Sequence, residues 1–161
     1  MKIKIKTKKG FTLLEVMAVM GIVAVMTAVA LSAIVNSRNR TELESAANEV
    51  MAAIRETQNY ALTGKRDGSN DVCTGYKFTS DVAESNRYVI SGEPSTCNFF
   101  VGQKLSGGVT FSGGSLSIEF TTPHADMIPS GTTIIITLIK GGHNYCVFIN
   151  NAGLITKGQC P

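Results

Sequence analysis

The chain has 161 residues, which is enough for one domain of ordinary size. Its formal net charge of +3 comes from the N-terminus, where five lysines and no acidic residue occupy the first ten positions. Without these ten residues, ten basic side chains face twelve acidic ones. This balance argues against a broad electrostatic affinity for DNA, although it leaves a local basic patch open.

A membrane-length apolar segment follows the lysines. No charged residue occurs from Val16 to Val35, and about 20 apolar residues of helix cross a bilayer core. Because the lysine cluster precedes this segment, the positive-inside rule places the N-terminus in the cytoplasm. The sequence therefore predicts a basic leader at 1–10 and the membrane half of a helix at 11–35, with the rest of the chain on the outer side of the membrane.

The helix is expected to continue beyond the membrane. From Arg38 to Leu62, apolar residues recur with a helical period, and charged residues fill the opposite face. Neither proline nor a glycine cluster interrupts the chain before Gly64, which begins a turn-like G-K-R-D-G stretch. We therefore predict one helix from about residue 12 to 62, in which 36–64 forms the amphipathic half.

The remaining segment, 65–161, has the pattern of a β-rich globular head. Alternating or short apolar runs between glycine-rich turns predict strands at 76–78, 87–90, 99–101, 109–111, 115–121, 132–139, 145–149 and 154–156. The apolar stripe of the helix and the inner faces of the strands must cover each other. The predicted fold class is α+β, with the amphipathic half of the helix packed on one antiparallel sheet or on two small ones.

All four cysteines lie in the part of the chain that is expected outside the membrane, at Cys73, Cys97, Cys146 and Cys160. An even number of cysteines in an exported domain predicts two disulfides. The sequence allows three pairings, of which Cys73–Cys97 with Cys146–Cys160 closes the shorter loops and is preferred. The cysteine spacing matches no zinc pattern, and we expect neither a metal nor a cofactor.

The junction between the lysines and the apolar run reads KKGFTLLEV. An ordinary secretory signal has its small residues after the apolar core, whereas here the glycine precedes the core. The order Gly10, Phe11, Glu15, between a basic leader and an apolar segment, resembles the type IV prepilin signature, which is a class III signal peptide. The resemblance implies that a prepilin peptidase cuts between Gly10 and Phe11 on the cytoplasmic side and then N-methylates Phe11.

Glu15 matches the glutamate that guides assembly in this family by pairing with the amino terminus of a neighbouring subunit. An ionisable residue within a membrane segment is costly and is functional by default. Cleavage would create an amine at Phe11, one helical turn away, and the two charges offset each other's desolvation among bundled helices. A local alternative stays open, because Thr12-Leu-Leu-Glu15 also fits a capping box at the start of the helix.

Two features bear on the kind of subunit. Many major pilins carry a proline within the first half of the mature helix, where this chain reads Leu31-Ser-Ala-Ile34. The segment 49–62 resembles minor pilins of the GspH/FimT type. The resemblance thus implies a structural subunit, a minor pilin or pseudopilin, of a type IV pilus or type II secretion filament. It would lie in the inner membrane and then in the pilus or pseudopilus, with prepilin peptidase, other pilin subunits and the inner-membrane assembly platform as partners.

The alternative function is a DNA-binding minor pilin for DNA uptake, with contacts from Lys104, Lys140 and Lys157. Enzymatic activity is not expected, because His124 and His143 have no serine or cysteine motif beside them. His124 and Asp126 are interpreted as polar side chains on the surface and not as a catalytic pair. Asp67 and Asp71 lie in a short acidic loop that lacks the rest of an EF-hand spacing, which predicts a solvated turn.

Overall fold

The computed structural model describes residues 11–65, 73–81 and 84–161, and its longest element is the helix α1, Leu13–Thr63. The predicted single helix from about residue 12 to 62 is therefore confirmed. The segment contains no proline, and α1 ends where Gly64 adopts a φ of 59°, a value that favours glycine. The Gly64 N–H donates to the Tyr60 carbonyl at 2.9 Å and closes the last turn.

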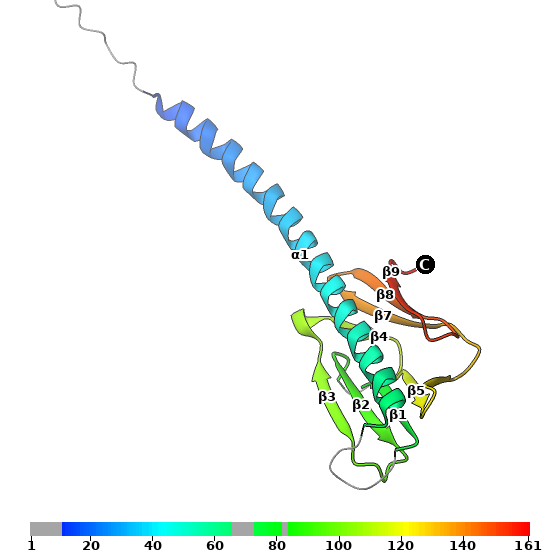
Figure 1. Ribbon diagram of the computed structural model, residues 1–161. Helices are drawn as coiled ribbons and strands as arrows, with labels where there is room; N and C mark the ends of the chain where they lie inside the picture. The colour runs from blue at the N-terminus through cyan, green and yellow to red at the C-terminus, as the bar shows by residue number, and fades with distance from the viewer. Residues whose placement is uncertain (1–10, 66–72, 82–83) are drawn as a thin grey trace, which may run out of the picture. The chain divides into compact units, whose positions relative to one another are not determined.

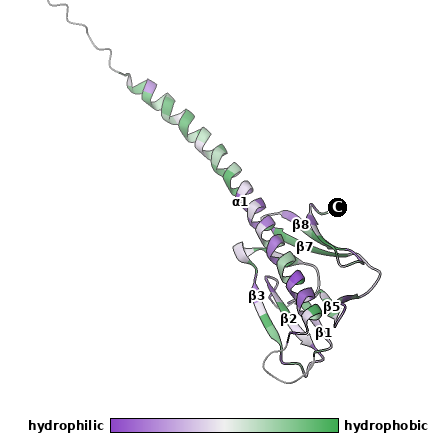
Figure 2. Cartoon of the chain, viewed as in Figure 1, coloured by the Kyte–Doolittle hydropathy of each residue, from purple (hydrophilic) through white to green (hydrophobic). Residues whose placement is uncertain are grey.

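The chain divides into two compact units within α1. One ends at Ser37, and the other, here called the head unit, is Arg38–Pro161. Figure 2 shows mostly apolar residues along the first part of α1 and interspersed hydrophilic residues along the second part. In the first unit the helix is exposed throughout. In the head unit α1 buries a single face, made of Leu43, Ala46, Ala47, Val50, Ala53, Ile54, Thr57, Tyr60 and Ala61.

The first of two sheets in the head unit, sheet A, has five antiparallel strands in the order β3-β2-β1-β5-β6. The strands are β1 (Gly75–Ser80), β2 (Arg87–Glu93), β3 (Phe100–Lys104), β5 (Ser117–Thr121) and β6 (Asp126–Ile128). Side chains along β1 point alternately to the two faces of the sheet. Tyr76 and Phe78 on one face are fully covered, whereas Lys77 and Thr79 on the other face are partly exposed. Sheet A therefore has one apolar and one solvated face, as is usual in antiparallel sheets.

The second sheet, sheet B, has four antiparallel strands in the order β4-β7-β8-β9. The strands are β4 (Thr110–Ser112), β7 (Ile134–Lys140), β8 (His143–Ile149) and β9 (Ile155–Gly158), and a short 3-10 turn, η1 (Ser106–Gly108), precedes β4. The predicted hairpin between β7 and β8 is confirmed. Its turn places Gly141 and Gly142 at φ values of 55° and 78°, where two-residue hairpins require positive φ.

The predicted strands correspond to eight of the observed ones, with shifts at their ends. The strand β6 was missed: no strand was predicted between Pro123 and Pro129, where it contains only three residues. It pairs with β5 at the edge of sheet A, where Met127 is buried against the core. Prolines flank but do not interrupt this edge strand, which is consistent with the lack of a ladder donor in proline.

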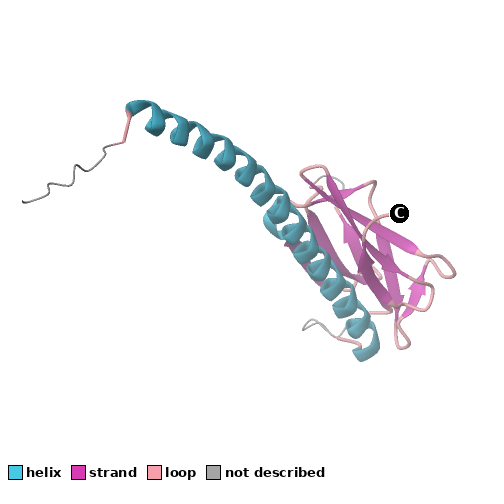
Figure 3. Ribbon diagram, turned by 90° about the horizontal axis from the view of Figure 1, so that it is seen from above, coloured by secondary structure: helices cyan, strands magenta, loops and turns pink. Residues whose placement is uncertain are grey.

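The hydrophobic core lies between the second half of α1 and the inner faces of the two sheets (Figures 1 and 3). Tyr60 of α1, Tyr76 of β1 and Phe99 form an aromatic group with ring centroids 5.0–5.8 Å apart. Tyr88 stacks on Phe78, and its hydroxyl donates to Gln103 Oε1 at 2.8 Å. Burial, with smaller effects from Glu49 and Glu56, raises the pKa of Tyr88 to about 12, so this phenol stays protonated in the core.

Both disulfides form with the pairing that the loop lengths favoured, Cys73–Cys97 and Cys146–Cys160. The first joins the segment before β1 to the loop before β3, and the second fastens the C-terminal segment to β8. Gly92 lies against the first disulfide so closely that a Cβ there would be 3.2 Å from Cys73 Sγ. The head unit is thus cross-linked at both sheets, which restricts its unfolded ensemble.

Candidate functional site

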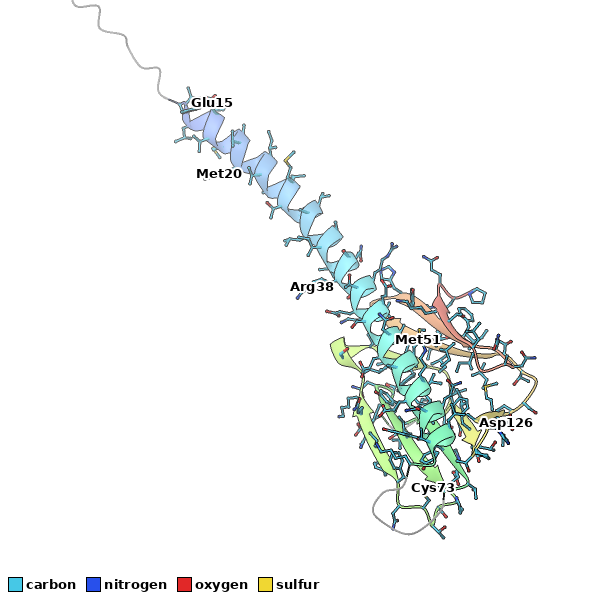
Figure 4. The ribbon with its side chains drawn as sticks, in the orientation of Figure 1. Glu15, Met20, Arg38, Met51, Cys73 and Asp126 are labelled. Atoms are coloured by element: carbon cyan, nitrogen blue, oxygen red, sulfur yellow. A yellow bond between two sulfur atoms is a disulfide. The ribbon has the colours of Figure 1, made fainter. Side chains whose placement is uncertain are left out.

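The start of α1 carries the residues of the predicted processing and assembly site. Thr12 caps the helix: its Oγ1 accepts a hydrogen bond from the Glu15 backbone N–H at 3.3 Å, and its carbonyl accepts from the same N–H at 3.1 Å. This contact is one half of the predicted capping box. Glu15 lies in the first turn of α1 (Figure 4). Phe11, the expected new N-terminus, lies two residues before the helix begins at Leu13, while Gly10 lies outside the described residues.

The Glu15 carboxylate takes part in none of the ion pairs formed within residues 11–65, 73–81 and 84–161. Its neighbours in the sequence are apolar and exposed: Phe11, Leu13 and Leu14 are 82%, 81% and 77% exposed. A carboxylate in such a setting stays charged at little cost only while water or an opposite charge reaches it. The geometry therefore leaves Glu15 available to a cation that another molecule supplies.

Two hydroxyl groups in the membrane half of α1 form hydrogen bonds to the backbone of the same helix. The stretch is long and apolar enough to cross a membrane, and none of it is buried. The Thr27 hydroxyl donates to the Val23 carbonyl, and the Ser32 hydroxyl donates to the Val29 carbonyl, each at 2.8 Å. Since hydroxyls without partners are costly in an apolar medium, these local bonds suit the segment to lipid or to a bundle of helices.

A second set of contacts, which the sequence did not predict, joins the second half of α1 to η1 and sheet B within the head unit. The Lys140 ammonium at the end of β7 donates to the Glu42 carboxylate and to the Gly107 carbonyl of η1. Lys157 of β9 pairs with Glu44 at 2.7 Å. The backbone N–H and the hydroxyl of Ser106 donate to Glu49 at 3.3 and 3.2 Å. These carboxylates, which belong to the charged face predicted for the helix, hold η1 and sheet B.

Removing the Glu42 carboxylate is expected to destabilise the head unit. The Lys140 side chain is 22% exposed, so Glu42→Ala would leave a largely covered ammonium without its partner and cost about 1–3 kcal/mol of unfolding free energy. The matched control is Glu84→Ala, which removes the exposed pair with Lys104 and should cost at most about 0.5 kcal/mol. Denaturant unfolding of the full chain in detergent measures both. Equal losses would contradict a role of Glu42 in holding the head.

The three lysines proposed as DNA contacts all have carboxylate partners. Lys140 and Lys157 point toward α1 and meet Glu42 and Glu44, while Lys104 lies 3.2 Å from Glu84. Each ammonium would have to exchange its partner for a phosphate. The structure thus presents these lysines as paired surface groups rather than as one basic patch.

The remaining candidates are not brought together into a site. His124 and Asp126 line a hollow of about 370 Å³ beside the end of α1, and His143 begins β8. Within the described ranges, no group of three or more His, Cys, Asp or Glu side chains is arranged to hold a metal ion. Asp67 and Asp71, assigned to a solvated turn, lie outside the described residues.

Comparison with known proteins bears on the N-terminal segment. Residues 5–31 match the family model of the prokaryotic N-terminal methylation motif. The matched range contains Gly10, Phe11 and Glu15 together with most of the apolar segment. No curated protein and no solved structure matched the chain. The motif, the membrane-length helix and the α+β head are together consistent with a type IV pilin-like protein.

Proposed function

We propose that this type IV pilin-like protein is a structural subunit, a minor pilin or a pseudopilin, of a type IV pilus or a type II secretion filament. One observation carries the proposal: the N-terminal methylation motif runs directly into a helix whose first turn holds Glu15. The motif supports processing by prepilin peptidase in general. The role of the processed protein as a filament subunit is what we infer from its helix and head.

Processing is proposed to occur between Gly10 and Phe11, with N-methylation of Phe11. The five leader lysines favour a cytoplasmic N-terminus, and the apolar segment that follows anchors the chain in the inner membrane. The head unit would then lie on the outer side. Its two disulfides support this orientation, because such bonds persist in oxidising compartments and are rare in the cytosol.

Assembly is proposed to use the membrane half of α1. In a bundle of such helices the apolar side chains exchange lipid for one another, and Glu15 of one subunit pairs with the Phe11 amine of a neighbour. A charge pair in a water-poor interior offsets the desolvation of both groups only when the two lie in contact. Glu15 thus favours one register between neighbouring helices over the others. Apolar contacts alone would not fix this register.

A minor pilin or pseudopilin is favoured over a major pilin by the helix itself. The helix α1 runs without proline from Leu13 to Thr63, including the position where many major pilins carry one. The amphipathic segment 49–62, which resembles minor pilins of the GspH/FimT type, buries its apolar face under the sheets. We propose a non-enzymatic role, with other pilin subunits and the inner-membrane assembly platform as partners.

The proposal is tested by affinity purification of a C-terminally tagged chain from solubilised membranes and from sheared filaments. We expect other pilin-like subunits, and an assembly-platform protein in the membrane fraction, to co-purify in an amount that depends on Glu15. Recovery of a processed chain without any such subunit would overturn the filament role while leaving processing intact.

DNA uptake remains the alternative function, and the structure lends it less support. The chain after cleavage is slightly acidic, and Lys104, Lys140 and Lys157 are each paired with a carboxylate. Retention of DNA by the purified processed chain at low salt, with loss of retention as the salt is raised, would favour this function. We expect no such retention.

A further inference from the structure

The head unit begins with two arginines that have no acidic partner in the described part of the chain. Arg38 and Arg40 are exposed, and neither takes part in the ion pairs formed within residues 11–65, 73–81 and 84–161. An α-helix turns about 100° per residue, so these two side chains lie on roughly opposite sides of α1. Figure 4 shows Arg38 on the side of α1 that faces away from the strands. Two guanidinium groups, which stay charged at any physiological pH, therefore flank the start of the head unit.

The carboxylates that follow these arginines along α1 are paired with other groups. Glu42 and Glu44 are the next two acidic residues, and they meet the sheet B lysines Lys140 and Lys157. Each of these carboxylates is thus neutralised by a lysine of the head unit and not by an arginine of α1. A net positive charge therefore remains where the head unit starts, although the chain after cleavage is slightly acidic as a whole.

The turn between β7 and β8 lies beside the same part of α1. Gly141 in this turn packs so closely against the Asn39 side chain that a Cβ would have no room there. His143 is partly exposed and lies opposite Lys140 in the register, so it shares the side of sheet B that faces α1. We call this surface of the head unit the basic end; it consists of Arg38, Asn39, Arg40, Gly141, Gly142 and His143. None of these residues is acidic.

The basic end begins just after a segment whose length matches a bilayer. The uncharged residues from Val16 to Val35 form about 30 Å of helix, which is the thickness of a hydrocarbon core. Arg38 follows after about 4.5 Å of helix and Arg40 after about 7.5 Å. The polar headgroups occupy about 5–8 Å on each side of the core. When the apolar segment spans the core, both arginines therefore lie at the depth of the lipid phosphates.

We propose that the basic end binds the phosphate groups of anionic lipids in the outer leaflet of the membrane. Two observations select this partner. The basic end is continuous with the membrane segment of α1, and its positive charge complements an anionic headgroup layer. A guanidinium also presents paired N–H donors that match the oxygens of a phosphate. Because the attraction falls off within about 8 Å at physiological salt, only charges at the depth of Arg38 and Arg40 take part.

The contact would fix the depth of α1 in the membrane. Glu15 stands just before the apolar segment and Arg38 just after it, so slippage in either direction would draw a charged group into hydrocarbon at a high cost. The inference rests on the proposed function, since only an anchored chain with its head on the outer side brings these arginines to that leaflet. Extraction of the subunit into a filament breaks the contact, which therefore belongs to the state that waits in the membrane.

The first test measures which lipids the full processed chain retains. The chain is reconstituted in vesicles of equal parts phosphatidylglycerol, which is anionic, and phosphatidylcholine, which has no net charge. Bound lipids are then counted by native mass spectrometry after extraction into a mild detergent. We expect the unaltered chain to prefer phosphatidylglycerol, and the double variant Arg38→Gln, Arg40→Gln to retain at least about tenfold less of it.

The matched control for this test is Arg55→Gln. Arg55 is also exposed on α1 and has no ion pair within the described ranges, but it lies about four turns beyond the basic end. This variant should retain as much phosphatidylglycerol as the unaltered chain. Undiminished retention by the double variant, an equal loss in Arg55→Gln, or no preference for phosphatidylglycerol in the unaltered chain would overturn the inference.

A photo-reactive benzoylphenylalanine tests the contact in the native membrane. His143→benzoylphenylalanine places the probe in the basic end, and Phe100→benzoylphenylalanine places it at a 64% exposed position on the solvated face of sheet A. We expect lipid adducts, identified by their mass, from position 143 and at least about tenfold fewer from position 100. Adducts of position 143 with a protein in place of lipid, or equal lipid adducts from both positions, would overturn the inference.

Two measurements in the same samples keep the outcomes apart. Formation of both disulfides reports that each variant has folded. The mass of the N-terminus reports whether the leader has been removed. A retained leader would overturn the proposed function and leave the lipid contact in place, whereas loss of the lipid adducts from a processed chain would overturn the inference alone.

Discussion

Glu15→Gln is expected to leave cleavage after Gly10 unchanged and to reduce incorporation into filaments at least about tenfold. Glutamine keeps the capping box with Thr12, since both Glu and Gln serve at this position of the helix. It removes only the negative charge, so the amine of the neighbouring Phe11 would enter the helix bundle without a counter-charge. The amount of tagged chain in sheared filaments, relative to the amount in membranes, measures the effect.

Two further variants separate the roles of Glu15. Thr12→Val removes the hydroxyl that accepts from the Glu15 N–H but keeps the carboxylate, and it should support near-normal incorporation. Glu15→Ala removes the carboxylate but keeps the backbone N–H that donates to Thr12 Oγ1, and it should behave like Glu15→Gln. Normal incorporation of Glu15→Gln together with a loss in Thr12→Val would show that assembly depends on the helix cap at Thr12 and not on an ion pair of Glu15.

Gly10→Val is expected to abolish removal of the leader. Glycine leaves the scissile bond without a side chain on its acyl side, whereas valine places a branched Cβ directly beside the carbonyl that is attacked. The chain should then keep its lysines, lack N-methylation and remain in the membrane. The intact mass of the purified chain, and its absence from sheared filaments, are the measurements.

The matched control for this effect is Gly21→Val. Gly21 lies within the membrane half of α1, and a Cβ added there would have no neighbour within 4 Å, so valine fits without a clash. The leader of this variant should be removed as in the unaltered chain. Cleavage of Gly10→Val at the unaltered rate would move the processing site away from Gly10.

The helix was predictable because its determinants are local. An uninterrupted apolar run, a continuous amphipathic period and the stop at Gly64 fix α1 without reference to any other part of the chain. The same applies to the hairpin at Gly141 and Gly142 and to most strands. The short strand β6 is different, since three residues carry too little alternation, and its pairing with β5 is decided by the sheet that it joins.

The division of the strands into two sheets was not predictable from pattern alone. Strand order depends on which strands find each other in space: β4 joins β7 across the chain, and β5 joins β1 rather than its sequence neighbour β4. The sequence pattern did not decide between one sheet and two small sheets. The same long-range choice decides which residues of each strand face away from the core.

The candidate site likewise has a local part that the sequence predicts and a long-range part that it does not. Gly10, Phe11 and Glu15 stand within one short segment, and their order predicts the processing motif that the family comparison supports. The fastening of α1 to the head joins groups far apart in sequence, such as Glu42 with Lys140 and Glu44 with Lys157. Their charges suggested a charged helix face and DNA contacts, because nothing in the sequence shows that these side chains lie opposite each other.

The central claim is that the chain is a processed, methylated subunit precursor, and the mass of its N-terminal peptide after purification from native membranes tests it most directly. The account predicts a chain that begins with N-methylated Phe11 and has lost the ten residues before it. A chain that retains Met1 and the leader lysines in its native membrane would contradict the account.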